Sequence, residues 1–202
     1  MYKIIKCEQG TDLWLKTRAP LITASEFAKV TTPAQCKRST SLNTLINKKV
    51  AVKLTGMVEE TFKSEAMQYG NDTEDEALEF LNFTYGHNFE KVGFLKSLEI
   101  PCGGSPDAID FENKIGAEIK CPINSTQVEY LLNGKIPNIY SSQVQGLMMI
   151  TGFNSWIFLS YSEHLKPFYI KVDRNEKYIE ALKNDLIYAG SEIKSRYEQL
   201  KD

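Results

Sequence analysis

The 202-residue sequence lacks the features that identify many common protein classes. It has two histidines, His87 and His164, so a histidine-based mechanism has few candidates. Its four cysteines are scattered and form no Cys-x-x-Cys pair, which argues against zinc or an iron–sulfur cluster and fits free thiols in a reducing compartment. No apolar run approaches the length of a membrane span, and the N-terminus lacks a signal peptide's apolar core. We therefore expect a protein without membrane segments that stays in the cytoplasm.

The sequence also lacks a strong excess of positive charge. Its formal net charge is -2 and its pI is about 5.8. Because most simple DNA-binding modules are basic, this balance argues weakly against such a module. It leaves room for a nucleic-acid enzyme with a local basic groove and an acidic, metal-neutralised centre. With 42% hydrophobic residues and no repeats, the chain is typical of one domain, which we expect to cover residues 1–202.

Hydrophobic periodicity predicts a mixed succession of helices and strands. The segment 31–40 contains Pro33 and is polar, so it is expected to be a loop, with Lys37 and Arg38 as basic residues that could contact a nucleic-acid backbone. The resulting order predicts an α/β or α+β fold with a central mixed β-sheet flanked by helices. The main helices are expected at 42–54, 64–85, 138–151 and 174–200, and the last two strands at 155–161 and 167–172.

The most informative stretch is 103–122, which reads GGSPDAIDFENKIGAEIKCP. A turn precedes Asp107, and two apolar segments, 108–111 and 115–120, are separated by a polar turn. A proline closes the stretch, where it would end strand pairing by removing a hydrogen-bond donor. The pattern predicts a β-hairpin.

Three charged side chains of this hairpin are expected to converge. Successive strand residues point to opposite faces, so Glu118 and Lys120 share one face, and closing the hairpin brings Asp107 alongside them. Paired carboxylates suit Mg²⁺, and the carbonyl of Ile119 is a further oxygen ligand between them. A neighbouring lysine can position a metal-bound water and stabilise charge that develops on a phosphoryl group.

The spacing Glu-x-Lys is weak evidence by itself, because a second copy occurs at Glu192-Ile193-Lys194. That copy lies in a strongly helical segment, where residues two apart do not face each other. The copy at 118–120 follows Ser-Pro-Asp and lies on a strand. From spacing alone, a hairpin with a surface ion pair remains the alternative interpretation.

Two other features suggest contacts with a substrate. Arg18 and Ser25 flank a helix break at Pro20, where an arginine fork and the free N–H groups of a helix start could bind phosphate. A solvated arginine and a helix cap are the alternative. The long helix also carries acidic residues at 72–79, which usually form a solvated face, although one member could point toward a metal.

Several of these pieces together resemble the phage lambda exonuclease and YqaJ-type viral recombinase family, within the PD-(D/E)xK nuclease superfamily. They occur in the family's order and cover roughly residues 8 to 200. The pieces are WLKTR at 14–18 with ITAS at 22–25, Tyr69-Gly70 with Glu74, Ser105-Pro106-Asp107, Glu118-Ile119-Lys120-Cys121-Pro122, and Gln143-Val144-Gln145.

The resemblance implies a role for each matching residue. Asp107, Glu118, Glu74 and the carbonyl of Ile119 would bind metal, and Lys120 would be the catalytic lysine. Four more, Arg18, Ser25, Ser105 and Gln143, would line a pocket for a terminal 5′-phosphate. Met67 falls where the family has an apolar wedge at the DNA end, although a helical methionine is usually core. Two segments, the one between Lys120 and Gln143 and the loop near Lys37, are shorter than in the lambda protein. The resemblance therefore implies the cleavage chemistry more firmly than it implies binding of the duplex and processivity.

The implied activity is a Mg²⁺- or Mn²⁺-dependent 5′→3′ exonuclease on double-stranded DNA ends, which releases mononucleotides and leaves a 3′ single strand. The resemblance also implies a homotrimeric ring around DNA, a single-strand annealing protein as partner, and the cytoplasm of a bacterium or phage-infected host. Two alternatives remain: an endonuclease on the same fold, and a non-catalytic protein that binds DNA ends. The complete acid–acid–lysine set argues against the second.

Overall fold

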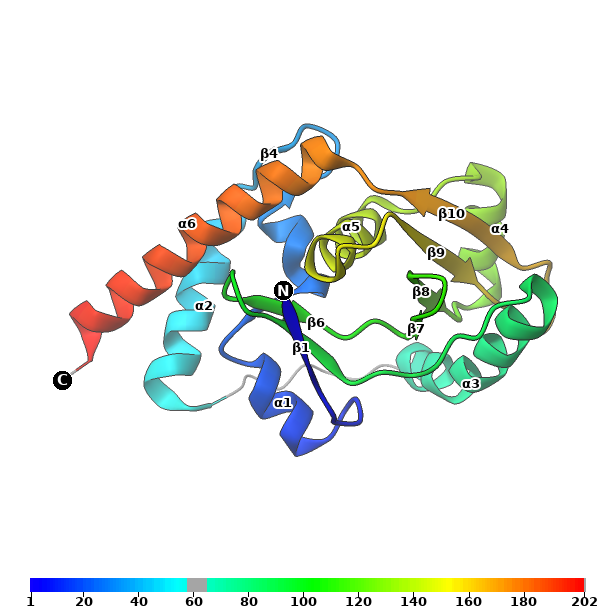
Figure 1. Ribbon diagram of the computed structural model, residues 1–202, viewed down its shortest axis with the longest axis horizontal. Helices are drawn as coiled ribbons and strands as arrows, with labels where there is room; N and C mark the ends of the chain where they lie inside the picture. The colour runs from blue at the N-terminus through cyan, green and yellow to red at the C-terminus, as the bar shows by residue number, and fades with distance from the viewer. Residues whose placement is uncertain (58–64, 202) are drawn as a thin grey trace.

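The computed structural model describes residues 1–57 and 65–201, with the side chains of 65–72 excluded. It is a mixed α/β structure in which helices flank β-sheets, as predicted (Figure 1). The described elements in chain order are β1 (Tyr2–Ile5), α1 (Asp12–Arg18), β2 (Ile22–Thr23), the 3₁₀ helix η1 (Ala24–Lys29), β3 (Thr31–Thr32), β4 (Lys37–Arg38), α2 (Leu42–Thr55), α3 (Glu65–Tyr85), β5 (Phe94–Ser97), β6 (Cys102–Gly104), β7 (Ala108–Asp110), β8 (Ile115–Lys120), α4 (Asn124–Asn133), α5 (Asn138–Thr151), β9 (Ser155–Ser160), β10 (Phe168–Asp173) and α6 (Glu176–Leu200).

The described strands form two four-stranded sheets and one two-stranded ribbon instead of a single central sheet. The first sheet has the order β1-β5-β6-β2, and the second has the order β10-β9-β8-β7. In the second sheet β7 and β8 form the predicted antiparallel hairpin, with Ala108 opposite Ala117. Strand β8 then pairs in parallel with β9, so it has a hydrogen-bonded neighbour on each side. This internal strand carries the Glu-Ile-Lys sequence of the candidate site.

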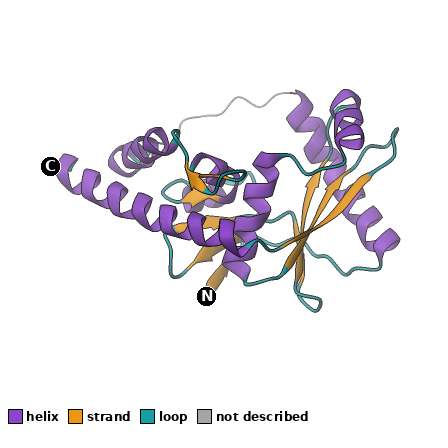
Figure 2. Cartoon of the chain, turned by 90° about the horizontal axis from the view of Figure 1, so that it is seen from above, coloured by secondary structure: helices purple, strands orange, loops and turns teal. Residues whose placement is uncertain are grey.

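Two apolar clusters hold the sheets to their helices. The larger cluster joins η1, α2, α5 and α6, and includes Phe27, Leu147 and Trp156, all with no exposed surface. The smaller cluster packs α3 against the second sheet and includes Leu81 and Ile119. Helices α3 and α6 lie on opposite sides of the molecule, and α6 extends away from it toward the C-terminus (Figures 1 and 2).

The expected loop at 31–40 is instead a short hairpin, β3–β4, bound to α6. Arg38 donates from Nε to Asp185 at 2.9 Å, and its guanidinium carbon lies 3.7 Å from the ring centroid of Tyr188. The hydroxyl of Thr31 also donates to Asp185, at 2.7 Å. Arg38 therefore attaches the β3–β4 hairpin to α6, a role that its polar surroundings in the sequence did not indicate.

Candidate functional site

The β7–β8 hairpin brings Asp107, Glu118 and Lys120 together, as the strand periodicity predicted. The ammonium of Lys120 lies 2.6 Å from Glu118 Oε1 and 3.4 Å from Asp107 Oδ2. Asp107 Oδ2 also accepts a 2.6 Å hydrogen bond from the backbone N–H of Ile119. Asp107 immediately precedes β7, and its side chain continues the contact with β8 past the Ala108–Ala117 pair. This hydrogen bond fixes the position of Asp107 relative to Glu118.

Glu118 is the most buried of the charged groups, with no exposed surface. Its Oε1 accepts from Lys120 and, at 2.6 Å, from the side-chain amide of Gln143 on α5. Its Oε2 is also buried, and among the described residues it finds no hydrogen-bond partner. Burial, followed by the negative charge of Asp107, raises the pKa of Glu118 to about 8. The site therefore has a buried carboxylate oxygen that is available for a ligand.

Lys120 is held by more than the two carboxylates. It donates to the carbonyl of Ile119 at 2.8 Å, and its ammonium lies 5.4 Å from the ring centroid of Tyr140. Burial alone would lower the pKa of Lys120, but Asp107 and Glu118 together outweigh burial and raise it. Lys120 is therefore a cation at neutral pH.

Glu74 extends from α3 toward the same site. Burial and then the charge of Asp107 raise the pKa of Glu74, so the two carboxylates influence each other electrostatically. Glu74 is balanced on its other side by Lys91, whose ammonium is 3.7 Å from Glu74 Oε1 and also pairs with Asp75. Among the acidic side chains of α3 that the structure describes, Glu74 is thus one that interacts with the charge of Asp107.

The donor set suits a hard divalent cation. Asp107, Glu118 and Glu74 bear negative charges that repel one another, so they gain stability when a cation is shared among them. Oε2 of Glu118, which has no hydrogen-bond partner among the described residues, is a free oxygen for such a cation. Among the described residues, however, no three His, Cys, Asp or Glu side chains are grouped so that they could hold a metal ion. At present the ammonium of Lys120 supplies the positive charge between Asp107 and Glu118.

A second polar group, which we call the Arg18 group, consists of Trp14, Arg18, Thr23, Ser25 and Ser105. The guanidinium carbon of Arg18 lies 4.1 Å from the Trp14 ring centroid, and its Nη2 lies 3.4 Å from the hydroxyls of both Thr23 and Ser25. The indole N–H of Trp14 donates to Ser105 at 2.8 Å. Burial lowers the pKa of Arg18. An arginine fork beside the hydroxyls of Thr23 and Ser25, with Ser105 held by the neighbouring Trp14, has the chemistry of an oxyanion site.

The structure distributes the predicted phosphate residues over two places. Arg18, Ser25 and Ser105 are brought together around Trp14, whereas Gln143 hydrogen-bonds to Glu118 in the acidic site. The side chain of Met67, the predicted wedge, lies outside the described residues.

Sequence reasoning missed three residues of these sites. Trp14 was noted only as part of a motif, yet its ring contacts Arg18 and its N–H reaches Ser105. Tyr140 lies over Lys120, and Lys49 is a buried cation close to the Arg18 group. Lys49 could have been found from the sequence, because it lies on the apolar stripe of the helix predicted at 42–54, the side that should be buried.

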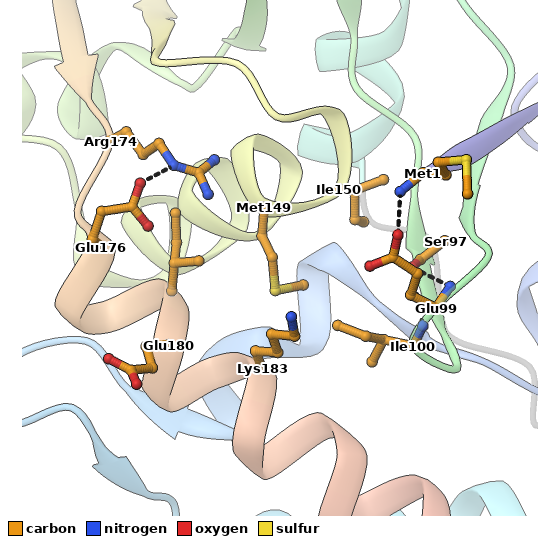
Figure 3. Close-up of a pocket in the computed structure, with 11 residues that line it drawn as sticks. Met1, Ser97, Glu99, Ile100, Met149, Ile150, Arg174, Glu176, Glu180 and Lys183 are labelled. Atoms are coloured by element: carbon orange, nitrogen blue, oxygen red, sulfur yellow. Dashed lines mark hydrogen bonds and ion pairs between the residues drawn. The ribbon is translucent and has the colours of Figure 1, made fainter.

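A hollow of about 350 Å³ lies elsewhere, between β5, the end of α5 and the start of α6 (Figure 3). Its charged groups are largely satisfied within the chain. Glu99 accepts from the amino group of Met1 at 2.8 Å, and Glu176 accepts from Arg174. The chemistry expected of the molecule therefore lies with the acidic site and not with this hollow. None of the described helices is of a length and apolarity that would let it cross a membrane.

Fold and acidic site together define a mixed α/β protein with a PD-(D/E)xK core. The model of the YqaJ-like viral recombinase domain family matches residues 13–154, and the chain belongs to this family. Among curated proteins, no sequence matches the chain.

Solved structures agree with this assignment. The alkaline exonuclease LHK-Exo from Laribacter hongkongensis is 27% identical, with a TM-score of 0.84 over 94% of this chain and 96% of its own. The same protein has been solved in complex with dAMP, with the same values. A phage-related exonuclease from Haemophilus somnus 129PT is 15% identical, with a TM-score of 0.67 over 90% of this chain and 96% of its own. At 15% identity, the Haemophilus somnus protein shows a likeness of fold alone.

Proposed function

We propose that the chain is a metal-dependent 5′→3′ exonuclease that acts on double-stranded DNA ends. It would release 5′-mononucleotides and leave a 3′ single strand for recombination by strand annealing. The family and the likeness to LHK-Exo, an alkaline exonuclease, support a nuclease. The observation that carries the proposal is Glu118, a fully buried carboxylate beside Lys120 and Asp107, one oxygen of which accepts no hydrogen bond from the part of the chain that the structure describes.

The acidic site would hold Mg²⁺, with Mn²⁺ as a substitute, through Asp107, Glu118, the Ile119 carbonyl and Glu74. When bound, such a cation would supply an activated water and stabilisation of the leaving oxygen in phosphodiester hydrolysis. Lys120 contributes its own fixed positive charge, which favours negative charge developing on the phosphoryl oxygens.

The Arg18 group would receive the terminal 5′-phosphate. The guanidinium of Arg18 beside the hydroxyl of Ser25, together with the hydroxyl of Ser105 next to Trp14, would offer donors to several phosphate oxygens. LHK-Exo, which has this fold, has been solved in complex with dAMP, a nucleoside monophosphate, and this supports the binding of a nucleotide. Gln143 remains a predicted phosphate ligand, and its bond to Glu118 would link phosphate binding to the acidic site. Met67 remains the predicted wedge at the DNA end.

The assembly and setting of the enzyme are part of the same proposal. The family resemblance favours a homotrimeric ring around DNA, which suits a chain of net charge -2 because only the channel must be positive. The expected partner is a single-strand annealing protein that binds the exposed 3′ strand, in the cytoplasm of a bacterium or a phage-infected host.

One comparison of substrates tests the proposal. A linear duplex with a 5′-phosphate, the same duplex with a 5′-hydroxyl, and a closed circle are each incubated with Mg²⁺ and with EDTA. Preferential release of mononucleotides from the phosphorylated duplex, dependent on Mg²⁺, is the expected result. Cleavage of the circle would indicate an endonuclease instead. End binding without turnover would indicate a non-catalytic protein that binds DNA ends.

A further inference from the structure

A buried ion pair lies next to the Arg18 group. Lys49, on α2, has a side chain that is 7% exposed, and its ammonium is 2.9 Å from Glu26 Oε2 on η1. Burial lowers the pKa of Lys49, and the charge of Glu26 opposes this effect. A buried ion pair often contributes little net stability, because desolvation offsets the attraction. Its presence beside a proposed anion site therefore calls for a functional explanation.

Glu26 is connected to the Arg18 group through Thr23. The same oxygen that binds Lys49, Oε2, accepts from the Thr23 backbone N–H at 2.9 Å and from the Thr23 hydroxyl at 3.1 Å. The Thr23 hydroxyl in turn lies 3.4 Å from Arg18 Nη2. One threonine thus separates the carboxylate of Glu26 from the guanidinium of Arg18.

Arg18 itself has no carboxylate within ion-pair distance in the described part of the chain. Burial lowers the pKa of Arg18, and Glu26 is the charged group that counteracts this effect, so the two interact across Thr23. Arginine forms strong bidentate pairs with carboxylates and with phosphates alike. If Glu26 lacked its lysine, it would compete with an incoming phosphate for Arg18.

We propose that Lys49 is a positioning residue that determines specificity for 5′-phosphorylated ends. By binding Glu26, Lys49 keeps this carboxylate from pairing with Arg18, and the guanidinium stays available for phosphate. Arg18, Lys49 and Glu26 together carry two positive charges and one negative charge, and this net positive charge favours the binding of an anion. This inference rests on the proposed function, since it concerns the same terminal phosphate.

The test is the ratio of kcat/KM for a 5′-phosphorylated duplex to that for a 5′-hydroxyl duplex, with Mg²⁺ as cofactor. Arg18→Ala defines the ratio without phosphate recognition. Lys49→Met should lower the wild-type ratio about 10-fold or more, because Glu26 would then pair with Arg18. The phosphate would lose one charge-assisted hydrogen bond from the guanidinium. The double variant Lys49→Met/Glu26→Gln should recover most of the wild-type ratio, because it removes the competing carboxylate as well. Lys53→Met is the control, because Lys53 is an exposed lysine of the same helix that contacts Tyr197 and not the Arg18 group, and it should leave the ratio unchanged.

The double variant separates positioning from mere structural support. Failure of the double variant to recover the ratio would overturn the proposal, because it would mean that Lys49 contacts phosphate directly or only supports the fold. An unchanged ratio in Lys49→Met would also overturn it. If Lys49→Met does not fold, Lys49→Gln replaces it with the same expectation. A wild-type protein without any phosphate preference would instead contradict the proposed phosphate pocket itself.

Discussion

The chain contains the tripeptide Glu-Ile-Lys twice, at 118–120 on β8 and at 192–194 on α6, and the two copies behave differently. Both isoleucines are buried, at 3% and 7% exposure. On the strand, the ammonium of Lys120 lies 2.6 Å from the carboxylate of its own tripeptide. On the helix, Glu192 pairs with Arg196 at 2.9 Å, one turn further along, and Lys194 is exposed.

The difference follows from backbone periodicity and burial. Residues two apart share a face on a strand but not on a helix, where the neighbour is four residues away. The strand copy also lies inside a sheet, so its carboxylate loses water, whereas the helix copy stays partly solvated. A short motif therefore has chemical meaning only after its secondary structure and its depth are known.

The strongest test compares the two lysines. Lys120→Ala should reduce DNA hydrolysis at least about 100-fold, since it removes a fixed charge at the reacting group, while Lys194→Ala should have no effect. Mononucleotide release from a 5′-phosphorylated duplex measures both. Circular dichroism and end binding, expected to persist in both variants, provide the control. Near-normal turnover in Lys120→Ala would mean that the site is wrongly assigned.

A second test concerns Asp107, the carboxylate that lies beside the strand copy of Glu-Ile-Lys. Asp107→Asn keeps an oxygen that can accept from the Ile119 N–H but removes a charged metal ligand. We expect the Mg²⁺ concentration for half-maximal activity to rise about 10-fold or more, in the range seen when metal sites lose supporting interactions. Thermal unfolding should change little. An unchanged Mg²⁺ requirement would exclude Asp107 as a ligand.

A third test uses Asp110, a buried carboxylate on the same hairpin with a structural role. Burial would raise its pKa, but hydrogen bonds from Asn113 and Asn88 outweigh burial and lower the pKa to about 2. The stabilisation is therefore complete above the unfolded value near 3.8 and is lost as pH falls toward 2. At neutral pH, Asp110→Asn should cost about 2 kcal/mol in free energy of unfolding.

Measurement by chemical denaturation from pH 7 down to pH 2 checks this prediction. The difference between wild type and Asp110→Asn should shrink as the pH falls, and the Mg²⁺ requirement of the variant should equal that of wild type. A constant difference across this range would show that the charge of Asp110 does not contribute.

The smallest expected effect is that of Glu192→Gln. It removes one helical ion pair with Arg196, partly exposed to solvent, which is worth about 0.3–0.5 kcal/mol. Denaturant unfolding should detect a slight loss of stability at low salt and less at high salt, because ions screen the pair. Any loss of nuclease activity in this variant would contradict the assignment of the helix copy as structural.

Much of the local structure could be predicted from the sequence. The helix at 138–151 has the expected bounds, and the hairpin brings Asp107 to the backbone of β8 as strand periodicity requires. The mixed α/β fold was likewise confirmed. These features depend on patterns within a few residues of one another, which a sequence displays directly.

Other features depend on contacts between distant segments. The bond from Gln143 to Glu118, the pair of Lys49 with Glu26 and the attachment of Arg38 to Asp185 each join separate elements. No local sequence pattern identifies such partners. A polar residue on a helix or in a turn is predicted to be solvated unless its neighbour in space is known. The division into two sheets was missed for the same reason.

The parallel pairing of β8 with β9 has a consequence for how the protein acquires activity. Parallel neighbours require a crossover, and here the chain passes through α4 and α5 before β9 can dock beside Glu118. Such non-local pairing is slow to form, because the chain must lose loop entropy before the contacts stabilise it. A newly made chain should therefore remain unable to cleave DNA until β9 has paired with β8, and nuclease activity should not return during refolding before this pairing has formed.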